Sequence, residues 1–356
     1  MVVFGIANAY GALSLQTAGG AGAAFALRQL VGALFGLLAL SVVSRVDYHI
    51  WRRLAWPFLL VTIIALLIPV LPGLGKYAPS LNGARRWVEI GRIRFQPSEV
   101  ARLAVVIWCA MLAAKKGAQV REFKKGVLPF LVGIGVVSLL IFLEPNLSMA
   151  TLVALLGMVV LFAAGAKIGH FILLGFGGLL LVYQKIQSAQ YRLARLSTFL
   201  NPGDGSDAAS MQIHQSLVGI GSGRLFGVGF GEGQQKLFLP YAYSDFLFST
   251  IGEEWGFLGL VLVVVLVGLF LWLGFRIARS APDPFGQFLA TGITAMIGIT
   301  AAMHMAVSLA LMPTTGLTLP FMSYGRSSLV ISLVATGILV NIGRMRGRPA
   351  RETTAA

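Results

Sequence analysis

The segment 244–275, SDFLFSTIGEEWGFLGLVLVVVLVGLFLWLGF, is the longest apolar run of the chain and contains no lysine or arginine. Its length suits a membrane-spanning helix, which needs about 20 apolar residues. The carboxylates Asp245, Glu253 and Glu254 lie at its beginning. A carboxylate at membrane depth costs roughly 2.5–3.5 kcal/mol on insertion scales, so such a group marks function by default. The segment therefore predicts chemistry or ion handling at a membrane surface.

The composition of the whole chain is that of a membrane protein. Hydrophobic residues make up 57% of the 356 residues, charged residues only 12%, and the mean hydropathy is +0.82. A soluble domain of this size could not cover so much apolar surface. The net charge of +15 surrounds apolar runs, which favours a membrane and argues against nucleic acid as a partner. We predict an all-α polytopic membrane protein with one integral membrane domain over 1–356.

The apolar runs and the basic residues predict the topology. Fifteen of the 28 lysines and arginines lie in alternate connections and near the C-terminus, a side that the positive-inside rule makes cytoplasmic. Both termini are then cytoplasmic, with a tail over 345–356, and the connection 187–244 is a long extracytoplasmic loop. Because the first span is short, a native start upstream of Met1 is an open alternative. The ten predicted spans are 1–15, 27–44, 53–71, 98–114, 126–143, 147–165, 168–186, 245–275, 286–311 and 327–344.

A further set of arginines lies on the opposite side, where orientation does not require positive charge. An anionic ligand at the outer leaflet explains the set, because arginine binds phosphate through two parallel hydrogen bonds. For any single residue, snorkelling toward lipid headgroups is the alternative. The candidates for ligand binding are Arg28, Arg85, Arg86, Arg94, Arg102 and Arg195.

Two carboxylates near these arginines also have structural alternatives. Glu99 follows Pro97 at the start of the fourth span, where it complements the helix dipole, and it lies three residues before Arg102. Glu144 precedes a helix break at Pro145 and either pairs with an arginine or serves a ligand. The sequence leaves both choices open.

Other polar features are expected to be structural or to line a cavity. The glycines between 219 and 233 follow no strand, so they predict a flexible outer loop and not a dinucleotide site. His304 is expected to be a hydrogen-bonded core residue without zinc-ligand companions, and Cys109 a packed thiol. The irregular segment 311–329 is expected to line a cavity.

The chain contains the motifs NGARRW (82–87), FQPSE (95–99), EPNLS (144–148), FLNP (199–202), QSLVGIGSG (215–223), GVGFG (227–231), FLPYAYSDFLFSTIGEEWGFLG (238–259) and GLTLPFMSYGRSSL (316–329). Together these motifs resemble the SEDS family of shape, elongation, division and sporulation proteins. The resemblance runs in the expected order from about Arg28 to Asn341. It implies a glycosyltransferase that polymerises lipid II, an undecaprenyl-pyrophosphate-linked disaccharide peptide, at the outer face of the bacterial cytoplasmic membrane. It also implies a class B penicillin-binding protein as transpeptidase partner, and divisome or elongasome membrane proteins.

The resemblance assigns roles to single residues. It implies catalytic roles for Asp245 and Glu253, and substrate contacts for Trp87, Glu99, Gln215 and Ser216. From the residues alone, the favoured role of Trp87 is that of an interfacial anchor. The chain departs from the family pattern at Asn146, Arg102, His304 and Arg326. The segments QQKLFLP, EPNLS and GLTLP are more similar to the division branch, the FtsW type, than to the elongation branch, the RodA type.

The expected mechanism uses Asp245 as the general base for a sugar hydroxyl and the arginines, including Arg85, Arg86 and Arg195, as pyrophosphate ligands. A divalent cation, Mg²⁺ or Mn²⁺, held by Asp245 or Glu253 is the one cofactor considered. A flippase for the lipid-linked precursor, with Asp245, Glu253 and His304 as a proton relay, is the rival function. A scaffold without chemistry is the third alternative.

Overall fold

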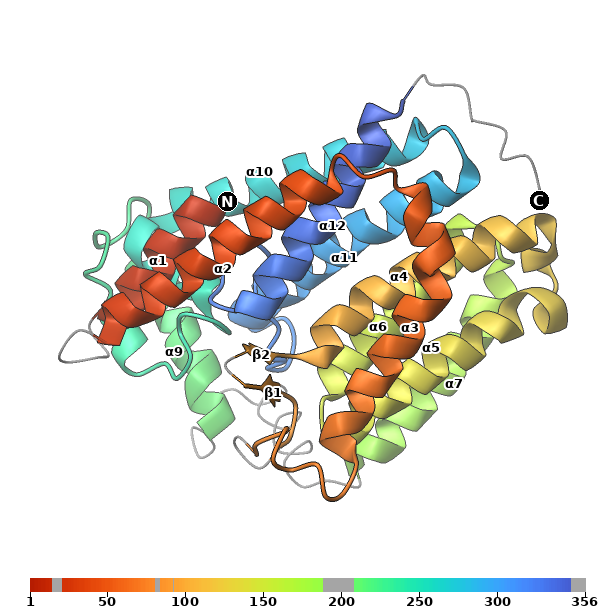
Figure 1. The fold of residues 1–356 in the computed structure, drawn as a ribbon. Helices are drawn as coiled ribbons and strands as arrows, with labels where there is room; N and C mark the ends of the chain where they lie inside the picture. Colours follow the sequence, from red (N-terminus) through yellow and green to blue (C-terminus); the bar gives the residue numbers. More distant parts are fainter. Residues whose placement is uncertain (15–20, 81–83, 92, 188–207, 347–356) are drawn as a thin grey trace. The chain divides into compact units, whose positions relative to one another are not determined.

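The computed structural model describes residues 1–14, 21–80, 84–91, 93–187 and 208–346, and these are predominantly α-helical (Figure 1). The all-α class predicted from the sequence is therefore confirmed. The helices are α1 (Val2–Ser14), α2 (Ala21–Val43), α3 (His49–Val70), α4 (Pro97–Lys116), α5 (Leu128–Leu143), α6 (Leu147–Ala163), α7 (Ile168–Gln187), α9 (Ala208–Ser222), α10 (Leu247–Arg279), α11 (Pro284–Ser308) and α12 (Arg326–Arg344).

Seven helical segments in the described part of the chain are long and apolar enough to cross a membrane. The segments Val2–Ala12 and Leu147–Ala163 are apolar but shorter. Each predicted span overlaps a helix, while the number of crossings and their direction stay predictions. The seven segments are Ala24–Val43, His49–Val70, Pro97–Arg121, Phe123–Leu143, Leu247–Arg279, Pro284–Ser308 and Arg326–Arg344.

The chain forms two compact units. The first comprises Met1–Leu34, Phe171–Leu269 and Gly298–Leu329, and the second comprises Phe35–His170, Phe270–Ile297 and Val330–Ala356. Helices α2, α10, α11 and α12 each contribute residues to both units. Asp245 belongs to the first unit, whereas Arg86 and Glu99 belong to the second.

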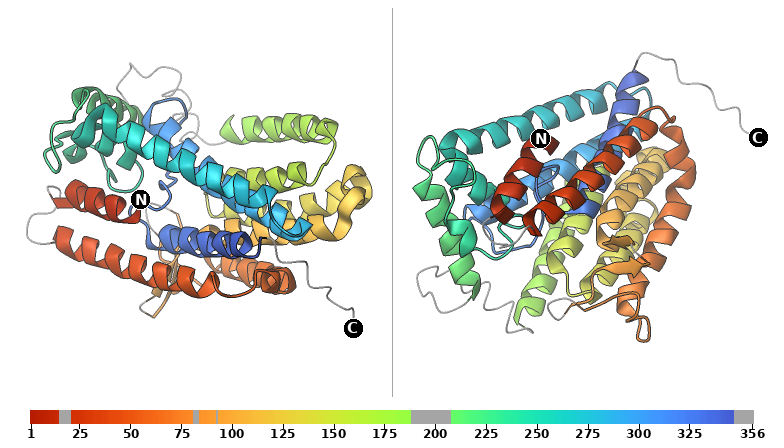
Figure 2. Two further views of the ribbon diagram at one scale, coloured as in Figure 1. Left: turned by 90° about the horizontal axis from the view of Figure 1, so that it is seen from above. Right: turned by 60° about the vertical axis from the view of Figure 1, so that its left-hand side comes forward.

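Helix α4 forms the core of the second unit, where it packs against α3, α5 and α6 (Figures 1 and 2). Every residue from Leu103 to Ala113 is buried, as expected for a helical stretch that is apolar on all sides. Glycines allow neighbouring helices of this unit to approach one another closely. A Cβ at Gly157 would lie 2.3 Å from the Ile134 side chain, and one at Gly292 would lie 2.6 Å from Val106.

A short β-hairpin precedes α4, in a region where no strand was expected. Strands β1 (Val88–Ile90) and β2 (Ile93–Phe95) are antiparallel, and Glu89 lies opposite Arg94. Gly91, in the turn, has a φ of 62°, a conformation that glycine adopts without steric cost. The hairpin leads directly into α4, whose first turn contains Pro97 and Glu99.

Helix α10 is broken at Gly256, so the expected span 245–275 is not one straight helix. Gly256 has φ 65° and ψ −162°, a region of backbone conformation that is essentially restricted to glycine. A Cβ at this position would lie 2.3 Å from the backbone nitrogen of Gly227. The break therefore depends both on backbone freedom and on close packing of another segment.

That other segment is the glycine-rich stretch 223–231, which pairs with the break through backbone hydrogen bonds. Val228 N–H donates to Glu253 O (2.9 Å), and Phe257 N–H donates to Arg224 O (2.8 Å). A Cβ at Gly227 would lie 2.1 Å from Glu254 O. The expectation of a flexible outer loop is wrong here, because the glycines allow the stretch to dock on α10. Helix α9, immediately before it, was not expected either.

Candidate active site

Asp245 lies directly before α10 and is partly exposed. Ser244 Oγ donates a hydrogen bond to Asp245 Oδ1 (2.9 Å), and Asp245 N–H donates to Tyr241 O (2.9 Å). A Cβ at Gly316 would lie 3.7 Å from Asp245 Oδ2. The segment that begins at Gly316 thus approaches the carboxylate to van der Waals distance. Of the three carboxylates in this stretch, Asp245 alone is more than marginally exposed, because Glu253 and Glu254 are buried.

Hydrogen bonds fix the segment 316–325 to the residues before Asp245. Ser323 Oγ donates to Ser244 O (2.7 Å), and Tyr324 N–H donates to Tyr243 O (3.0 Å). Gln29 on α2 supports the same segment, because its Nε2 donates to Ser323 O (3.2 Å) and its Oε1 accepts from Gly325 N–H (3.3 Å). Three parts of the chain that are distant in sequence are thereby joined around one carboxylate.

His304 connects α11 to both of these segments. Its Nδ1 lies 2.7 Å from Leu317 O, and Phe248 N–H donates to its Nε2 (3.4 Å). A carbonyl must accept and an amide must donate, so the contacts require a neutral imidazole with the proton on Nδ1. The side chain is 1% exposed. The prediction of a hydrogen-bonded core histidine is confirmed, and the proton-carrier alternative loses support.

An aromatic cluster lies beside the Asp245 segment and was not predicted. The rings of Phe25, Tyr243 and Tyr324 contact one another, with centroid separations of 5.4–6.2 Å. The guanidinium of Arg28 lies over Phe25, 5.7 Å from the ring centroid. Burial raises the pKa of Tyr243, and Tyr241, Tyr324 and Asp245 raise it further. Tyrosine rings combine apolar faces with hydroxyl groups, and this surface suits a ligand that has both characters.

The backbone next to the carboxylate is strained on both segments. Tyr241 has a φ of 59° and Phe321 a φ of 65°. Non-glycine residues in this region cost on the order of 1–3 kcal/mol each, and they concentrate at functional sites. The hydrogen bonds between the two segments hold these conformations in place.

Glu253 and Glu254 are buried, and their contacts are structural. Glu253 Oε1 accepts from the backbone N–H groups of Gln234 (2.8 Å) and Gln235 (3.0 Å). Glu254 Oε1 forms an ion pair with Lys236 Nζ (2.8 Å), and both side chains are fully buried. The Lys236 ammonium also donates to Gly11 O (2.8 Å) and Gly231 O (2.7 Å). These contacts hold the segment 231–237 against the break in α10.

The predicted substrate ligands on α9 are buried or partly buried. Ser216 Oγ donates to Ser308 O (2.8 Å), so it connects α9 to α11. Gln215 is partly buried. Arg195 lies outside the described residues. Substrate contacts for these three residues stay predictions.

In the second unit, Arg86 contacts the backbone at the break between α5 and α6. Its Nε donates to Glu144 O (3.2 Å), and its Nη2 donates to Pro145 O. The Glu144 side chain is buried, and neither carboxyl oxygen has a hydrogen-bond partner among the described residues. Burial raises the pKa of Glu144 to about 8, against the opposing charge of Arg86. Asn146 caps α6, because its Oδ1 accepts from Met149 N–H (3.3 Å).

Two further arginines of this unit have acidic partners. Arg94 Nε lies 3.2 Å from Glu89 Oε1, across the hairpin, and the Arg94 guanidinium lies 4.8 Å from the Trp87 ring centroid. Arg94 therefore belongs to a cross-strand ion pair of the hairpin.

Glu99 and Arg102 form a buried ion pair (2.7 Å), and Arg102 Nη2 reaches Ser332 Oγ (3.5 Å). Burial gives this pair a structural role, whereas Arg85 is exposed. Contacts with a ligand remain predictions for all of them.

The described residues contain only part of the ligand set that a metal ion requires. No group of three or more His, Cys, Asp or Glu side chains among them lies close enough to hold a metal ion. Glu253 already accepts two backbone hydrogen bonds. Mg²⁺ is commonly bound by one or two carboxylates together with water and substrate phosphates. Asp245 thus fits a cation only as one ligand in a shell that a phosphate-bearing substrate completes.

Comparison with known proteins identifies the family. The family model for FtsW, RodA and SpoVE, described as "Cell cycle protein", matches residues 1–347. The chain belongs to this family. The SEDS resemblance that was predicted from its motifs is therefore confirmed.

Individual relatives of this SEDS chain align over nearly its full length. It is 38% identical to a "Probable peptidoglycan glycosyltransferase FtsW" of Geobacter sp. (strain M18), with 98% of this chain and 95% of the relative covered. It is 42% identical to the protein of that name from Trichlorobacter lovleyi, with coverages of 95% and 89%. It is 39% identical to "Stage V sporulation protein E" of Bacillus subtilis, with coverages of 90% and 87%. These similarities support the FtsW-like branch.

Solved structures share the fold. One, titled "Structural coordination of polymerization and crosslinking by a peptidoglycan synthase complex", matches with a TM-score of 0.78 and 28% identity over 98% of both chains. The rod shape determining protein RodA of Thermus thermophilus matches with a TM-score of 0.71 and 26% identity, over 98% of this chain and 94% of that one. Together with the apolar helices, these matches make the SEDS chain a multi-pass membrane protein.

Proposed function

We propose that this SEDS chain is a peptidoglycan glycosyltransferase that polymerises lipid II into glycan strands during cell division. One observation carries the proposal. The chain covers 95% of the length of a relative named as a peptidoglycan glycosyltransferase of the FtsW type, and its SDFLF segment at Asp245 is intact. The enzyme class thus follows from similarity over nearly the full length of both chains, and the geometry around Asp245 supports a place for the chemistry.

Asp245 is the proposed general base. Strand growth requires a sugar hydroxyl to attack the anomeric carbon of a second sugar while a lipid pyrophosphate departs. Asp245 would accept the proton of the acceptor 4-hydroxyl as the new glycosidic bond forms and the bond to pyrophosphate breaks. A single displacement of this kind inverts the anomeric centre and needs no covalent enzyme intermediate.

The leaving pyrophosphate requires positive charge. Arg28, in the same unit as Asp245, is exposed, and its guanidinium can bind phosphate oxygens bidentately. Arg85, Arg86 and Arg94 stay proposed ligands for the lipid phosphates. A divalent cation bound by Asp245 and completed by substrate phosphates would neutralise part of the same charge.

The finer topology belongs to the same proposal. We place ten spans in the bacterial cytoplasmic membrane, with both termini cytoplasmic and with Asp245 near the outer face. A class B penicillin-binding protein is the proposed transpeptidase partner, supported by the structural similarity to a complex that couples polymerisation to crosslinking. Membrane proteins of the divisome are further proposed partners.

The test is a polymerisation assay with purified full-length chain, its transpeptidase partner and lipid II. Wild type, Asp245→Ala and Glu232→Gln should be compared at matched concentration. Glu232 is an exposed carboxylate of the same unit, so its variant controls for loss of one negative charge. We expect glycan strands from wild type and Glu232→Gln, and none from Asp245→Ala.

Two other results would change the assignment. Normal polymer from Asp245→Ala would show that another group is the base. If no variant forms polymer although the complex is intact, translocation of the lipid headgroup across vesicle membranes should be measured next. Headgroup translocation without strand growth would support the rival flippase function.

A further inference from the structure

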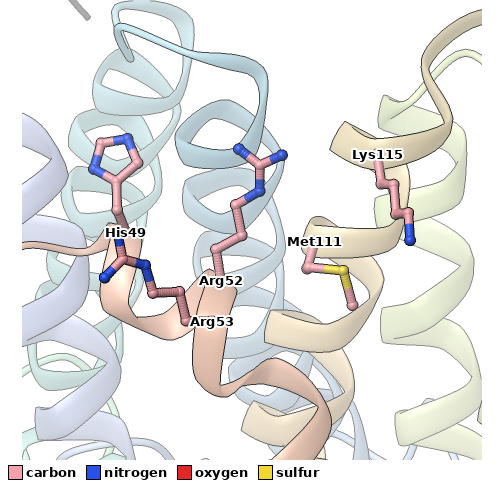
Figure 3. Close-up of a pocket in the computed structure, with 5 residues that line it drawn as sticks. All are labelled: His49, Arg52, Arg53, Met111 and Lys115. Atoms are coloured by element: carbon pink, nitrogen blue, oxygen red, sulfur yellow. The ribbon is translucent and has the colours of Figure 1, made fainter. Parts of the chain in front are cut away.

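A basic cavity of about 380 Å³ lies in the second unit, apart from every residue assigned above to polymerisation. Two helices form it. His49, Arg52 and Arg53 lie in the first turns of α3, and Met111 and Lys115 lie near the end of α4 (Figure 3).

The positive charges at this cavity are not neutralised by the described part of the protein. Arg52, Arg53 and Lys115 are exposed, and no hydrogen bond or ion pair to another described residue involves their side chains. Among the described residues, the only ion pairs at the cavity join the His49 ring to Asp47 (2.6 Å) and to Asp283 (3.7 Å). Three cations around one hollow favour a bound anion, and guanidinium groups favour phosphate.

The position of the cavity indicates the source of that phosphate. Helix α3 begins here and α4 ends here, and both are apolar enough to cross a membrane. The ends of spanning helices lie at the level of lipid headgroups. The positive-inside rule assigns this end to the cytoplasmic leaflet.

The surface next to the cavity suits acyl chains. Trp56 and Leu60, one and two turns beyond Arg52 on the same face of α3, are each 52% exposed. An amphiphile can thus place its phosphate between the arginines and its chains along α3. A free phosphate ion would use only the first of these surfaces.

We infer that this cavity binds the phosphate headgroup of an anionic phospholipid from the leaflet that its helix ends adjoin. Such basic pockets between spanning helices are a known way to hold anionic lipids. The lipid would be bound in addition to the substrate and would anchor the α3–α4 end of the second unit in the membrane.

The experiment is native mass spectrometry of the full-length chain in detergent, titrated with phosphatidylglycerol or with phosphatidylcholine of the same acyl chains. The test variant is Arg52→Gln with Arg53→Gln. The matched control is Lys124→Gln with Lys125→Gln, which removes two exposed charges between α4 and α5. Arg52→Lys with Arg53→Lys keeps both positive charges and removes only the guanidinium geometry. Lipid binding that this variant retains shows that substitution at these positions leaves the protein folded.

We expect phosphatidylglycerol to bind wild type more tightly than phosphatidylcholine, and the test variant to lose about 30-fold in affinity. The control variant should stay within about threefold of wild type, and the lysine variant should retain intermediate binding. Equal losses in the test and control variants would overturn the site in favour of diffuse attraction to basic residues.

Two further outcomes would also overturn it. Displacement of the lipid by millimolar inorganic phosphate at constant ionic strength would identify the ligand as free phosphate. Binding that instead depends on Arg276 and Arg279, which line a second basic cavity of about 450 Å³ with Trp272, would place the lipid there.

Discussion

Asp245 and the pair Glu253–Glu254 lie within ten residues of one another, yet the structure gives them different surroundings. Asp245 is partly exposed and accepts a hydrogen bond from the neighbouring Ser244 hydroxyl. Glu253 and Glu254 are 3% and 2% exposed, and they bind two backbone amides and a buried lysine. The sequence shows three similar carboxylates, whereas the structure separates one partly exposed carboxylate from two buried carboxylates that hold the fold.

The difference indicates that the role of a carboxylate depends on how deeply it is buried and on which groups bind its oxygens. A buried carboxylate that accepts hydrogen bonds is stabilised in place, and its removal is felt through the fold. A partly exposed carboxylate beside strained backbone can exchange protons with a ligand at small structural cost. Kinetics and stability should therefore separate the two regions.

The largest effect on catalysis is expected for Asp245→Asn. The side chain keeps its size but loses the ability to accept a proton, so the rate should fall about 10²–10⁴-fold. The unfolding temperature should stay close to that of wild type, because the side chain is partly exposed and the amide keeps its size. Polymerisation rate and thermal unfolding of the same preparation check this. A fall in unfolding temperature that accounts for the lost rate would remove the contrast with Glu253 and Glu254.

The largest effect on stability is expected for Lys236→Met. It leaves the Glu254 carboxylate buried without its cation, which typically costs about 3–5 kcal/mol. The free energy of unfolding should be measured by denaturation in detergent. The double variant Lys236→Met with Glu254→Gln leaves no buried charge and should recover much of the loss. If the single and double variants are equally destabilised, the ion pair is not the cause.

A smaller loss of stability is expected for Glu253→Gln. The amide oxygen can still accept from the Gln234 and Gln235 amides, but the charge that strengthens these bonds is gone, so about 1–3 kcal/mol should be lost. Rate per folded molecule should change little. A hundredfold loss of rate at unchanged stability would instead place Glu253 in the catalytic machinery, as the family resemblance implies.

The smallest effect is a change in pH dependence at Glu144. Its pKa is raised to about 8, so the folded state binds a proton that the unfolded state releases above about pH 4.5. Stability should therefore be highest below pH 4.5 and decrease as the pH rises toward 8. Glu144→Gln should flatten this part of the profile of unfolding temperature against pH. An unchanged slope would mean that Glu144 is ionised and paired in the fold.

Much of the fold was predictable because apolar runs of span length specify helices, and each predicted span overlaps one. The hairpin was missed although Val88–Phe95 alternates apolar and charged residues around Gly91, a pattern typical of strands. The break at Gly256 was missed because a glycine inside an apolar run predicts a break only when another backbone packs against it. The sequence does not show that Gly227 supplies that backbone.

Those parts of the candidate site were predictable in which a single residue can be recognised from its sequence context. Asp245 stands out as a carboxylate beside an apolar run, and His304 as a solitary histidine in a span. Contacts across the chain were not predictable. Phe25 meets Tyr324 only after the chain has folded, and Lys236, an outer basic residue by sequence, is buried against Glu254 and Gly11. Membrane hydropathy contains no information about such pairings.

The break at Gly256 also bears on hydrophobic matching between the protein and the bilayer. As one straight rod, the 33 residues of α10 would extend about 50 Å, well beyond a hydrocarbon core of about 30 Å. The part after the break, Phe257–Arg279, extends about 35 Å and spans that thickness with modest tilt. Because of the break at Gly256, the short helix that bears Glu253 and Glu254 need not follow the axis of Phe257–Arg279. It can lie along the interface, where a carboxylate escapes most of the cost of immersion in lipid.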